Sequence, residues 1–554
     1  MITGTITTMS GQPAVGFKVK AFDRDDATGG KDDPMGEATT DAQGRYSIGP
    51  YAGKAWDTKL PGGTSWRPDI YIRVYQMIGG RWVVVKQSGT LEDHRLADDV
   101  TINLRLTGIS GIITDWNGAP VAGALVRAYD HDDLVVGLNE AHDFMGESRT
   151  NASGRFEMLY EHKDWDTKVP GSTSWRPDIF VEVLGTVRDH MIKIGQSQTY
   201  SNHPLHENLD KIRVNVPPRA AIDFKARDPG SGGLNVLAYN IYMRPSKTFN
   251  DGQSLRVPRI AEEIKRDYYD VIVFNEAFDD HLRAELRKNL ASVYAYNAKV
   301  PETGNPLRQD GSVKILSRWP IMNGNGKGQQ RVFGLPCLGA DCLADKGVVY
   351  VKIVKAGVPY HIFGTHLQAD ENPAMYGGKL VTSRDVRRSQ LNAIRKFINE
   401  MSIPKTEAVI ITGDLNINRY ANPPDEYNEM LKILNAAHPK IEGYPYSFDG
   451  RLNYLARSDG KQYLWDYVLY LGDHKQPMQH PGVGMAASNR VMFYRTDKPW
   501  RKMIPQLSWF IWDISDHFPV FGQFQFAPSM KAAPATPSPP SSTPPAQVGP
   551  APKR

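Results

Sequence analysis

The sequence predicts a multi-domain protein, with two all-β sandwich domains, then a layered domain of strands and helices, then a disordered Pro-rich tail. Three observations predict this order. The 554 residues are enough for several domains. The first half is a tandem repeat with strand-like alternation. The second half alternates short β-branched runs with helical patterns, which is typical of a domain that combines a sheet with covering helices.

The first half contains two copies of one pattern. Ala21-Phe22-Asp23 recurs as Ala128-Tyr129-Asp130, and Trp66-Arg67-Pro68-Asp69 recurs as Trp175-Arg176-Pro177-Asp178. A period of about a hundred residues is too long for a solenoid, so each copy is predicted to be a whole domain. Alternating apolar and polar residues predict strands in each copy. The expected boundaries are 1–107 and 108–216 for the copies, 217–233 for a linker, 234–527 for the third domain and 528–554 for the tail.

The two copies resemble transthyretin-like domains. The resemblance is carried by the Ala-aromatic-Asp strand end and by a Gly-Arg-aromatic hairpin, Gly44-Arg45-Tyr46 and Gly154-Arg155-Phe156. Acidic loops in both copies offer oxygen ligands, so they either bind Ca²⁺ or are solvated carboxylates. The ligand of the copies stays open between a cell surface, a glycan and a protein. The loop acids are Asp23, Asp25, Asp26, Asp32, Asp33, Asp130, Asp132, Asp133 and Asp143.

Composition restricts the partners and the location. The net charge of +5 is small for this length, so it supports a nucleic-acid or anionic-membrane partner only weakly. No run is long and apolar enough to predict a transmembrane segment. The start, Met1-Ile2-Thr3-Gly4, lacks the features of a signal peptide. The expected location is therefore either cytoplasmic, or outside the cell after removal of a signal or by another export route.

Two cysteines, Cys337 and Cys342, lie five residues apart. They can close a small disulfide loop, which suits an exported enzyme, or remain two unpaired thiols. A structural zinc site needs more ligands than two, so the pair does not predict zinc.

In the third domain, several predicted strands end in polar residues. The runs that begin at Leu237, Val271, His361 and Val409 are short, apolar and β-branched, and each predicts a buried strand. A segment Asp513-Ile514-Ser515-Asp516-His517 closes the set. Polar groups at the ends of such strands can converge on one rim of a sheet, where they suit a divalent cation holding a phosphate ester. The residues at these ends are Asn240, Glu276, His366, Asp414, Asn416, Asp516 and His517.

Helical periodicity lies between the predicted strands. Pro258 is expected to open a helix with Ile260, Ala261, Ile264 and Tyr268 on one face. Further helices are predicted around Val386–Ile398 and Tyr427–Leu434.

The residue types suggest separate chemical roles. Residues two apart on a strand face the same side, so Asp414 and Asn416 can point together into a site. Unpaired buried charge is costly, so Glu276 at the end of an apolar strand is the best metal ligand, with Asn240 beside it. His517 suits a general base that takes a proton from water. Asp414 is expected to steady its imidazolium, and Asp516 to help at the metal or the imidazole. Asp466, in Trp465-Asp466-Tyr467, is expected to anchor the histidine network.

The third domain resembles the endonuclease/exonuclease/phosphatase superfamily, and within it the bacterial sphingomyelinase C group of neutral sphingomyelinases. The broad resemblance rests on the polar strand ends described above, in the family's order. The narrower one rests on Asp310–Ile321, Asp341–Gly347, Thr365–Gln368 and Ser508-Trp509-Phe510. The resemblance implies a four-layered, DNase-like α/β sandwich and a magnesium-dependent phosphodiesterase, with Mn²⁺ or Co²⁺ as alternatives. It implies that sphingomyelin is cleaved to ceramide and phosphocholine, with His366 and Asn416 stabilising charge on the phosphoryl oxygens.

The resemblance also implies an Asp341–Lys346 pair near the phosphate, whereas a surface ion pair would contribute little. A phospholipid substrate in a membrane needs an approach surface, and Trp500, Trp509 and Phe510 are candidates for membrane contact because aromatic and basic residues are mixed there. A hairpin packed on the core is the alternative. Rival functions are a nuclease or inositol-phosphate phosphatase of the same fold, or a non-catalytic surface-binding protein.

Overall fold

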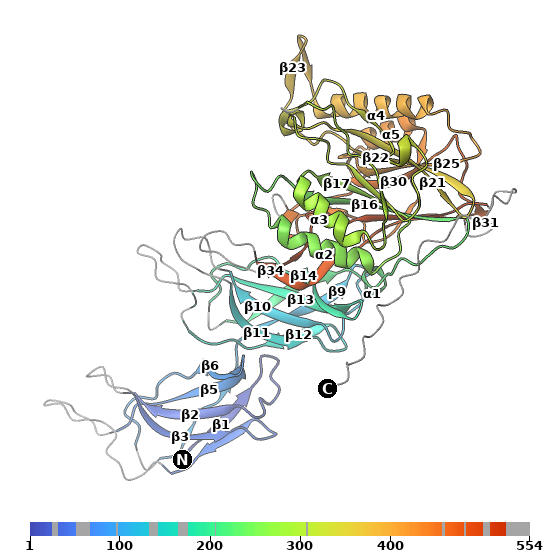
Figure 1. The fold of residues 1–554 in the computed structure, drawn as a ribbon. Coiled ribbons are helices and arrows are strands. Elements are labelled where there is room, and N and C mark those ends of the chain that lie inside the picture. The colour runs from blue at the N-terminus through green and yellow to red at the C-terminus, as the bar shows by residue number, and fades with distance from the viewer. Residues whose placement is uncertain are drawn as a thin grey trace, which may run out of the picture. The chain divides into compact units, whose positions relative to one another are not determined.

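The protein is described from a computed structural model (Figure 1). The chain divides into two compact units. The amino-terminal unit comprises Met1–Thr186 and Lys193–Val216, and the carboxyl-terminal unit comprises Val187–Ile192, Pro217–Lys502 and the chain from Phe510 on. The structure describes residues 1–24, 32–50, 67–95, 98–131, 142–163, 165, 176–204, 207–305, 308–456, 460–480, 484–501 and 510–527.

The amino-terminal unit is rich in β-strands, as the sequence predicts. Among the described residues, its strands form four sheets with the orders β4-β1-β7 (with β8 also on β1), β3-β2-β5-β6, β12-β9-β15 and β11-β10-β13-β14. The strands are β1 (Ile2–Thr7), β2 (Lys18–Asp23), β3 (Asp33–Thr39), β4 (Arg45–Ile48), β5 (Ile70–Ile78), β6 (Arg81–Gln87), β7 (Val100–Thr101), β8 (Leu104–Arg105), β9 (Ile109–Asp115), β10 (Leu125–Asp130), β11 (Asp143–Arg149), β12 (Arg155–Met158), β13 (Ile179–Val187), β14 (His190–Gln196) and β15 (Leu209–Val216).

Corresponding residues of the two copies make the same contacts. Thr40 Oγ1 donates to the carbonyl of Ala14 at 2.6 Å, and Thr150 Oγ1 donates to that of Val121 at 2.6 Å. Every second side chain is buried along both β2 and β10, because strand residues alternate between the two faces. The loop acids Asp25, Asp26, Asp132 and Asp133 lie outside the described residues, as does the expected tail.

The carboxyl-terminal unit contains two large sheets, with strand orders β18-β19-β17-β16-β36-β33-β27 and β20-β21-β22-β25-β30-β26. Smaller two-stranded sheets pair β23 with β24, β28 with β29, β31 with β32 and β34 with β35. The strands are β16 (Gly233–Met243), β17 (Val271–Ala277), β18 (Tyr296–Asn297), β19 (Lys314–Ser317), β20 (Gln329–Val332), β21 (Gly347–Lys355), β22 (Val358–His366), β23 (Ala374–Tyr376), β24 (Lys379–Val381), β25 (Ala408–Asp414), β26 (Ala436–Ala437), β27 (Lys440–Gly443), β28 (Phe448–Asp449), β29 (Gln462–Tyr463), β30 (Asp466–Leu471), β31 (Gln479–His480), β32 (Gly484–Met485), β33 (Ala487–Val491), β34 (Arg495–Arg501), β35 (Phe510–Asp513) and β36 (Val520–Gln525).

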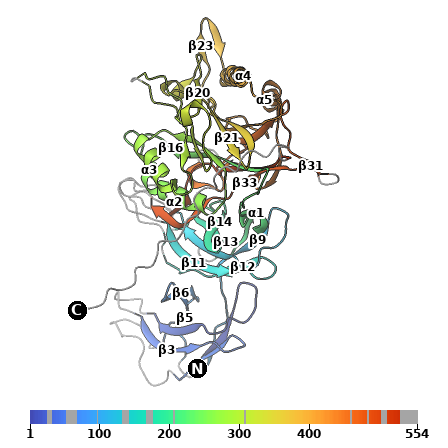
Figure 2. The ribbon, with the colours of Figure 1, turned by 45° about the vertical axis from the view of Figure 1, so that its right-hand side comes forward.

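Helices accompany both sheets of this unit (Figures 1 and 2). The first sheet shares one hydrophobic core with α2 and α3, whose apolar residues pack with Leu237, Ile272 and Phe521. On the second sheet, the Phe397 ring of α4 contacts the rings of Tyr350 and Phe363. The helices are α1 (Arg219–Ile222), α2 (Gln253–Lys265), α3 (Asp280–Leu290), α4 (Ser383–Glu400) and α5 (Asp425–Leu434), with short 3-10 turns at Gly324–Gly326, Gly339–Leu343 and Tyr454–Ala456.

Two of the three predicted helices are confirmed, and the start of the third is wrong. The boundary of α4 has a local cause, because Thr382 and Asp385 form a capping box at its start. Pro258 does not open a helix but lies inside α2, and Tyr268 lies beyond the end of that helix. The apolar stripe that was predicted for it, Ile260, Ala261 and Ile264, is buried. No helix in the described part of the chain is long and apolar enough to span a bilayer.

Candidate active site at the joint of the two large sheets

Strand register brings the predicted site residues together. On the first sheet, β16 and β17 run parallel and pair Asn240 with Asn275, which precedes Glu276. On the second sheet, parallel β22 and β25 pair His366 with Asp414, and antiparallel β30 pairs Asp414 with Asp466. The polar ends of strands far apart in the sequence therefore meet at one edge of each sheet.

Asn275 joins the two edges. Its Nδ2 donates to the Thr365 carbonyl at 2.8 Å, and its Oδ1 accepts from the Asp414 amide at 3.0 Å. Gly413 makes this approach feasible, because its φ is 138° and a Cβ there would stand 1.9 Å from the Thr365 oxygen. The backbone of β25 therefore approaches the neighbouring strand β22 closely at this position.

The carboxylate of Asp414 lies at the centre of the site. Its Oδ2 lies 3.0 Å from Asn240 Nδ2, 3.7 Å from His366 Nε2 and 3.9 Å from His517 Nε2. Asn240 Nδ2 also donates to Glu276 Oε1 at 3.0 Å. Asp414 Oδ1 accepts from the Asn416 amide at 2.9 Å, and this hydrogen bond positions Asn416 just beyond the end of β25. Five predicted site residues are thus assembled around one carboxylate.

His517 is oriented by Asp466. Its Nδ1 lies 2.7 Å from Asp466 Oδ2, which leaves Nε2 on the side of Asp414. The expected anchoring by Asp466 is thus met at Nδ1, and Asp414, which is expected to steady the imidazolium, faces Nε2 at 3.9 Å. Burial lowers the pKa of His517, but Asp466 and Asp516 outweigh this and raise it well above 6.5.

Asp516 interacts electrostatically with both His517 and Glu276. Burial, reinforced by the charge of Glu276 and opposed by His517, raises the pKa of Asp516 to about 7. Burial and then Asp466 raise the pKa of Asp414 to about 6, and burial with Asp414 raises that of Glu276. The crowding of these acids makes a negative site that a cation would stabilise.

His366 has the opposite electrostatics. Burial, then Lys346 and His517, lower its pKa well below 6.5, so its imidazole is neutral. Ser312 Oγ lies 3.4 Å from its Nδ1. A neutral imidazole can donate one hydrogen bond to an anionic substrate without adding charge.

The Asp341–Lys346 pair is not a surface ion pair. Lys346 Nζ lies 2.7 Å from Asp341 Oδ2, and the lysine is buried. The same ammonium donates to the carbonyl of Leu367, which also accepts from Asn416 Nδ2 at 3.1 Å. Asp341 Oδ2 accepts from the Ala369 amide at 2.8 Å. The pair thus holds the loop that leaves His366.

Cys337 and Cys342 are bonded to each other, which settles the two readings of the pair in favour of the disulfide. The loop that they close contains Asp341. Leu338, inside it, donates from its amide to Gln368 Oε1 at 3.0 Å. The disulfide loop is therefore attached to the same segment after His366.

Trp500 does not serve as a membrane contact in this structure. Only 2 % of its surface is exposed, and its Nε1 donates to the Asp513 carbonyl at 2.8 Å. The mixed aromatic and basic pattern did not reveal that this ring packs on Gly252, at the start of α2. Trp509 lies outside the described residues. Phe510 begins β35, and its side chain also lies outside the described part.

Sequence reasoning missed Arg256 of α2. Its side chain is buried, and Nη1 donates to the carbonyls of Ile241 at 2.8 Å and Ile514 at 3.0 Å. Its Nε and Nη2 donate to the carbonyls of Asp251 and Tyr242. Arg256 thereby ties the chain just after Asn240 to the chain just before Ser515. The sequence shows an arginine next to the apolar stripe of α2. This position does not by itself reveal which carbonyls the side chain binds.

The donor set fits a divalent cation. Asp414, Asp466 and His517 offer ligand atoms that all lie within 4.8 Å of one another. Asn240 Nδ2 lies 3.0 Å from both Asp414 Oδ2 and Glu276 Oε1, and the buried Asp466 Oδ1 has no hydrogen-bond partner. Hard oxygen donors of this kind suit Mg²⁺.

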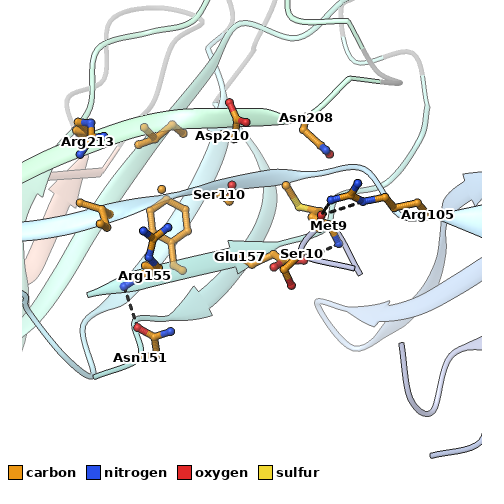
Figure 3. A pocket seen from close by; sticks show the side chains of 14 residues that line it. Met9, Ser10, Arg105, Ser110, Asn151, Arg155, Glu157, Asn208, Asp210 and Arg213 are labelled. Carbon is orange, nitrogen blue, oxygen red and sulfur yellow. Dashed lines mark hydrogen bonds between the residues drawn. The ribbon is translucent and has the colours of Figure 1, made fainter. Parts of the chain in front are cut away.

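A separate pocket of about 480 Å³ lies in the amino-terminal unit. Figure 3 shows Arg155, Asn151, Glu157 and Arg105 around it, with a hydrogen bond from the Arg155 amide to Asn151 at 3.0 Å. Of the predicted site residues, none lines this pocket.

The chain matches known hydrolases over its carboxyl-terminal half. Residues 237–477 match the Endonuclease/Exonuclease/phosphatase family. Sphingomyelinase C of Listeria ivanovii is 32% identical over 54% of this chain and 88% of its own length. Sphingomyelinase C of Leptospira interrogans is 35% identical in the matched region. The match covers 53% of this chain and 52% of that protein.

Among solved structures, that of sphingomyelinase C from Streptomyces griseocarneus aligns with 53% of this chain and 99% of its own, at 28% identity and a TM-score of 0.47. The matched stretch contains most of the site residues, and the Listeria protein is matched over most of its length. The chain therefore belongs to the endonuclease/exonuclease/phosphatase family of hydrolases, among relatives named sphingomyelinase C.

Proposed function

We propose that this protein is a magnesium-dependent phosphodiesterase that hydrolyses sphingomyelin to ceramide and phosphocholine. The observation that carries the proposal is the gathering around Asp414, where Asn240, His366 and His517 each lie within 3.9 Å of one carboxylate oxygen. Relatives named sphingomyelinase C support the choice of substrate.

The proposed reaction is attack of one water molecule on the phosphorus. His517 Nε2 takes the proton of the attacking water while Asp466 holds Nδ1 and stabilises the imidazolium. The bond from phosphorus to the ceramide oxygen breaks, the leaving oxygen takes a proton from solvent water, and His517 returns its proton to the solvent. His366 and Asn416 donate hydrogen bonds to the phosphoryl oxygens, which carry more charge in the transition state.

Glu276 and Asn240, with Asp516 beside them, are the residues that would hold Mg²⁺. Bound there, the ion supplies charge neutralisation and Lewis acidity at the phosphoryl group. Raised pKa values of Glu276 and Asp516 support this assignment, because crowded carboxylates gain most from a cation. Mn²⁺, which also suits carboxylate and carbonyl oxygens, is an alternative ion for this site, and Co²⁺ is another.

The amino-terminal half is proposed to hold two transthyretin-like β-sandwich domains, 1–107 and 108–216, with a linker at 217–233. Matched contacts of Thr40 and Thr150 support a repeated architecture. Their proposed role is to hold a surface ligand. Calcium there has little support, because Asp23 and Asp130 each use Oδ1 to accept a backbone amide, from Asp69 and Asp178, both at 2.7 Å.

The test is a substrate comparison on the full chain. Choline-labelled sphingomyelin, phosphatidylcholine, inositol phosphates and plasmid DNA are each incubated with and without Mg²⁺. The proposal expects release of phosphocholine from sphingomyelin only with the metal. Cleavage of DNA or inositol phosphates in its place would establish a rival enzyme of the same fold, and no turnover of any substrate would favour a surface-binding protein.

A further inference from the structure

The pocket of the amino-terminal unit carries two arginines on the outward face of the sheet β12-β9-β15. Ile112 of β9 pairs with Arg155 of β12 on one side and with Arg213 of β15 on the other. Paired residues share a face of the sheet, so the two arginine side chains flank Ile112. Their sequence neighbours Phe156 and Ile212 are buried, as alternation along a strand requires. Figure 3 shows both arginines at the same end of the pocket.

Two acids lie beside the arginines on the same face. Glu157 follows Arg155 by two residues on β12 and pairs with Ser110 of β9. On β15, a register shift brings Asp210 to the outward face, where its side chain is exposed. Figure 3 shows Ser110 between Asp210 and Glu157. The pocket therefore combines a cationic end with an anionic middle.

The other end of the pocket is formed by Met9 and the two residues that hold its backbone. The Met9 carbonyl accepts from Arg105, through Nε at 3.0 Å and also through Nη2. The Met9 amide donates to Glu157 Oε1 at 2.8 Å. Arg105 is thus engaged with the backbone, whereas Glu157 keeps Oε2 for another donor.

The remaining charges of the pocket are not neutralised by one another. In the part of the chain that the structure describes, no salt bridge joins Arg155, Arg213 or Asp210 to another charged group. The cavity between them, of about 480 Å³, has the size of an ordinary ligand pocket. Opposite charges that stay apart around such a cavity can be matched by a ligand with complementary groups.

The first copy shows that the repeated fold does not require these charges. At the matching sheet positions, Thr5 Oγ1 donates to Asn103 Oδ1 at 2.8 Å, and Thr3 Oγ1 lies 3.4 Å from Thr101 Oγ1. These side chains are neutral and bind one another. Only the arginine of the hairpin is kept, as Arg45, which pairs with Thr5. The charged face is therefore a property of the second copy.

The chemistry of the face selects among ligands. A guanidinium binds a carboxylate through two parallel hydrogen bonds, and a side-chain carboxylate accepts hydrogen bonds from hydroxyl groups. A simple anion such as phosphate would be repelled by the two acids. A neutral sugar would gain nothing from the charge of the two arginines. A sugar that carries both a carboxylate and hydroxyl groups satisfies both halves of the face.

We infer that this pocket binds an acidic saccharide of the uronate class. The sugar carboxylate lies between Arg155 and Arg213, and ring hydroxyls donate to Asp210 and to Glu157 Oε2. The inference rests on the surface ligand proposed for the amino-terminal half, to which it gives a chemical class. It does not depend on the hydrolytic reaction, because none of these residues belongs to the candidate active site.

The test is calorimetric titration of the full chain with uronate oligosaccharides. Trimers of galacturonate and of mannuronate and a hyaluronan tetrasaccharide supply different epimers, and EDTA removes the divalent cations that uronates also bind. At least one of these oligosaccharides is expected to bind. Its methyl ester, which keeps the hydroxyl groups but loses the charge, should bind at least about tenfold more weakly, because charge-assisted hydrogen bonds are lost.

Substitutions locate the binding. Arg155→Gln with Arg213→Gln should weaken binding of the same oligosaccharide at least about tenfold. Arg45→Gln is the matched control, since it changes the corresponding arginine of the first copy, and it should bind as the unmodified chain does. Asp210→Ala should also weaken binding, because a hydroxyl loses its acceptor, whereas a site for a simple anion would bind more tightly without that acid. Circular dichroism checks that each variant is folded.

Several results would overturn the inference: no binding of any of the uronates, equal binding of the methyl ester, unchanged binding by the double variant, equal loss with Arg45→Gln, or tighter binding by Asp210→Ala. Sphingomyelin hydrolysis is measured on the same samples. A chain that binds the uronate but hydrolyses nothing would sink the proposed reaction and leave this inference standing. A chain that hydrolyses sphingomyelin but binds no uronate would do the reverse.

Discussion

Buried aspartates occur in both units, but they serve different ends. In the amino-terminal unit, Asp23 and Asp130 are fully buried at strand ends, and each accepts one backbone amide from the neighbouring segment. In the carboxyl-terminal unit, Asp414, Asp466 and Asp516 are also buried, but they crowd one another and two histidines. Burial of a carboxylate therefore does not identify a site. A functional site is indicated by several buried carboxylates that lie close together.

The first way to test this contrast is to disturb the histidine of the crowded cluster. Asp466→Asn should lower the rate of sphingomyelin hydrolysis by about 10³-fold or more, because the amide cannot stabilise the His517 imidazolium. His517→Ala should lower it at least as much. Steady-state kinetics on labelled sphingomyelin measures both effects, with circular dichroism as the check that folding is intact. Turnover that survives His517→Ala would remove this residue as the base.

The next effect concerns the support of the cluster. Arg256→Met should destabilise the carboxyl-terminal unit by about 3 kcal/mol or more, because four carbonyls lose a charged donor. Urea unfolding followed by the fluorescence of the chain measures the change. Arg259→Met, on the same helix but with an exposed hydrogen bond to Lys498, is the control and should cost little. Equal effects of the two substitutions would contradict the special position of Arg256.

A third effect is the pH dependence of stability. Burial, with help from Arg419, lowers the pKa of His438 to about 3, and burial lowers that of His361 to about 4 although Glu407 opposes it. The unfolded chain binds these protons first, at about pH 6.5. Their stabilisation is therefore present above that pH and is lost as the pH falls towards 4, by up to about 1.4 kcal/mol per pH unit and histidine.

Urea unfolding between pH 7 and pH 4.5 measures this slope. His438→Asn should flatten it, since that side chain does not titrate. An unchanged slope in the variant would show that other groups cause the acid sensitivity.

The smallest effect is expected in the amino-terminal unit. Asp130→Ala should cost about 1–3 kcal/mol locally, because the Asp178 amide loses its acceptor, and should leave sphingomyelin hydrolysis unchanged. Amide hydrogen exchange of β10 and β13 measures the local loss. A drop in hydrolysis as large as that of Asp466→Asn would contradict the division of roles between the units.

The sequence predicted the parts of this account that depend on local pattern. The β-branched runs around Leu237, Val271, His361 and Val409 are strands, and the polar residues at their ends share two sheet edges. Such ends could be predicted because short apolar runs and turn residues mark them in one dimension. The α/β character of the carboxyl-terminal half followed from the same alternation of patterns.

The remaining features depend on packing between distant segments. Trp500 packs inward against Gly252 at the start of α2, and no spacing in the sequence records that contact. Pro258 lies within α2, and the buried face of that helix already includes Gln253, Arg256 and Val257 before it. No sequence motif identifies the role of Arg256, because its partners are backbone carbonyls, which every residue has.

Calorimetric titration of Mg²⁺ tests the gathering around Asp414 most directly. The unmodified chain and Asp130→Ala are expected to bind the ion alike, whereas Glu276→Gln should bind it at least about tenfold more weakly because a ligand charge is lost from the crowded acids. Undiminished binding by Glu276→Gln, or equal weakening by Asp130→Ala, would contradict a cation site built from these strand ends.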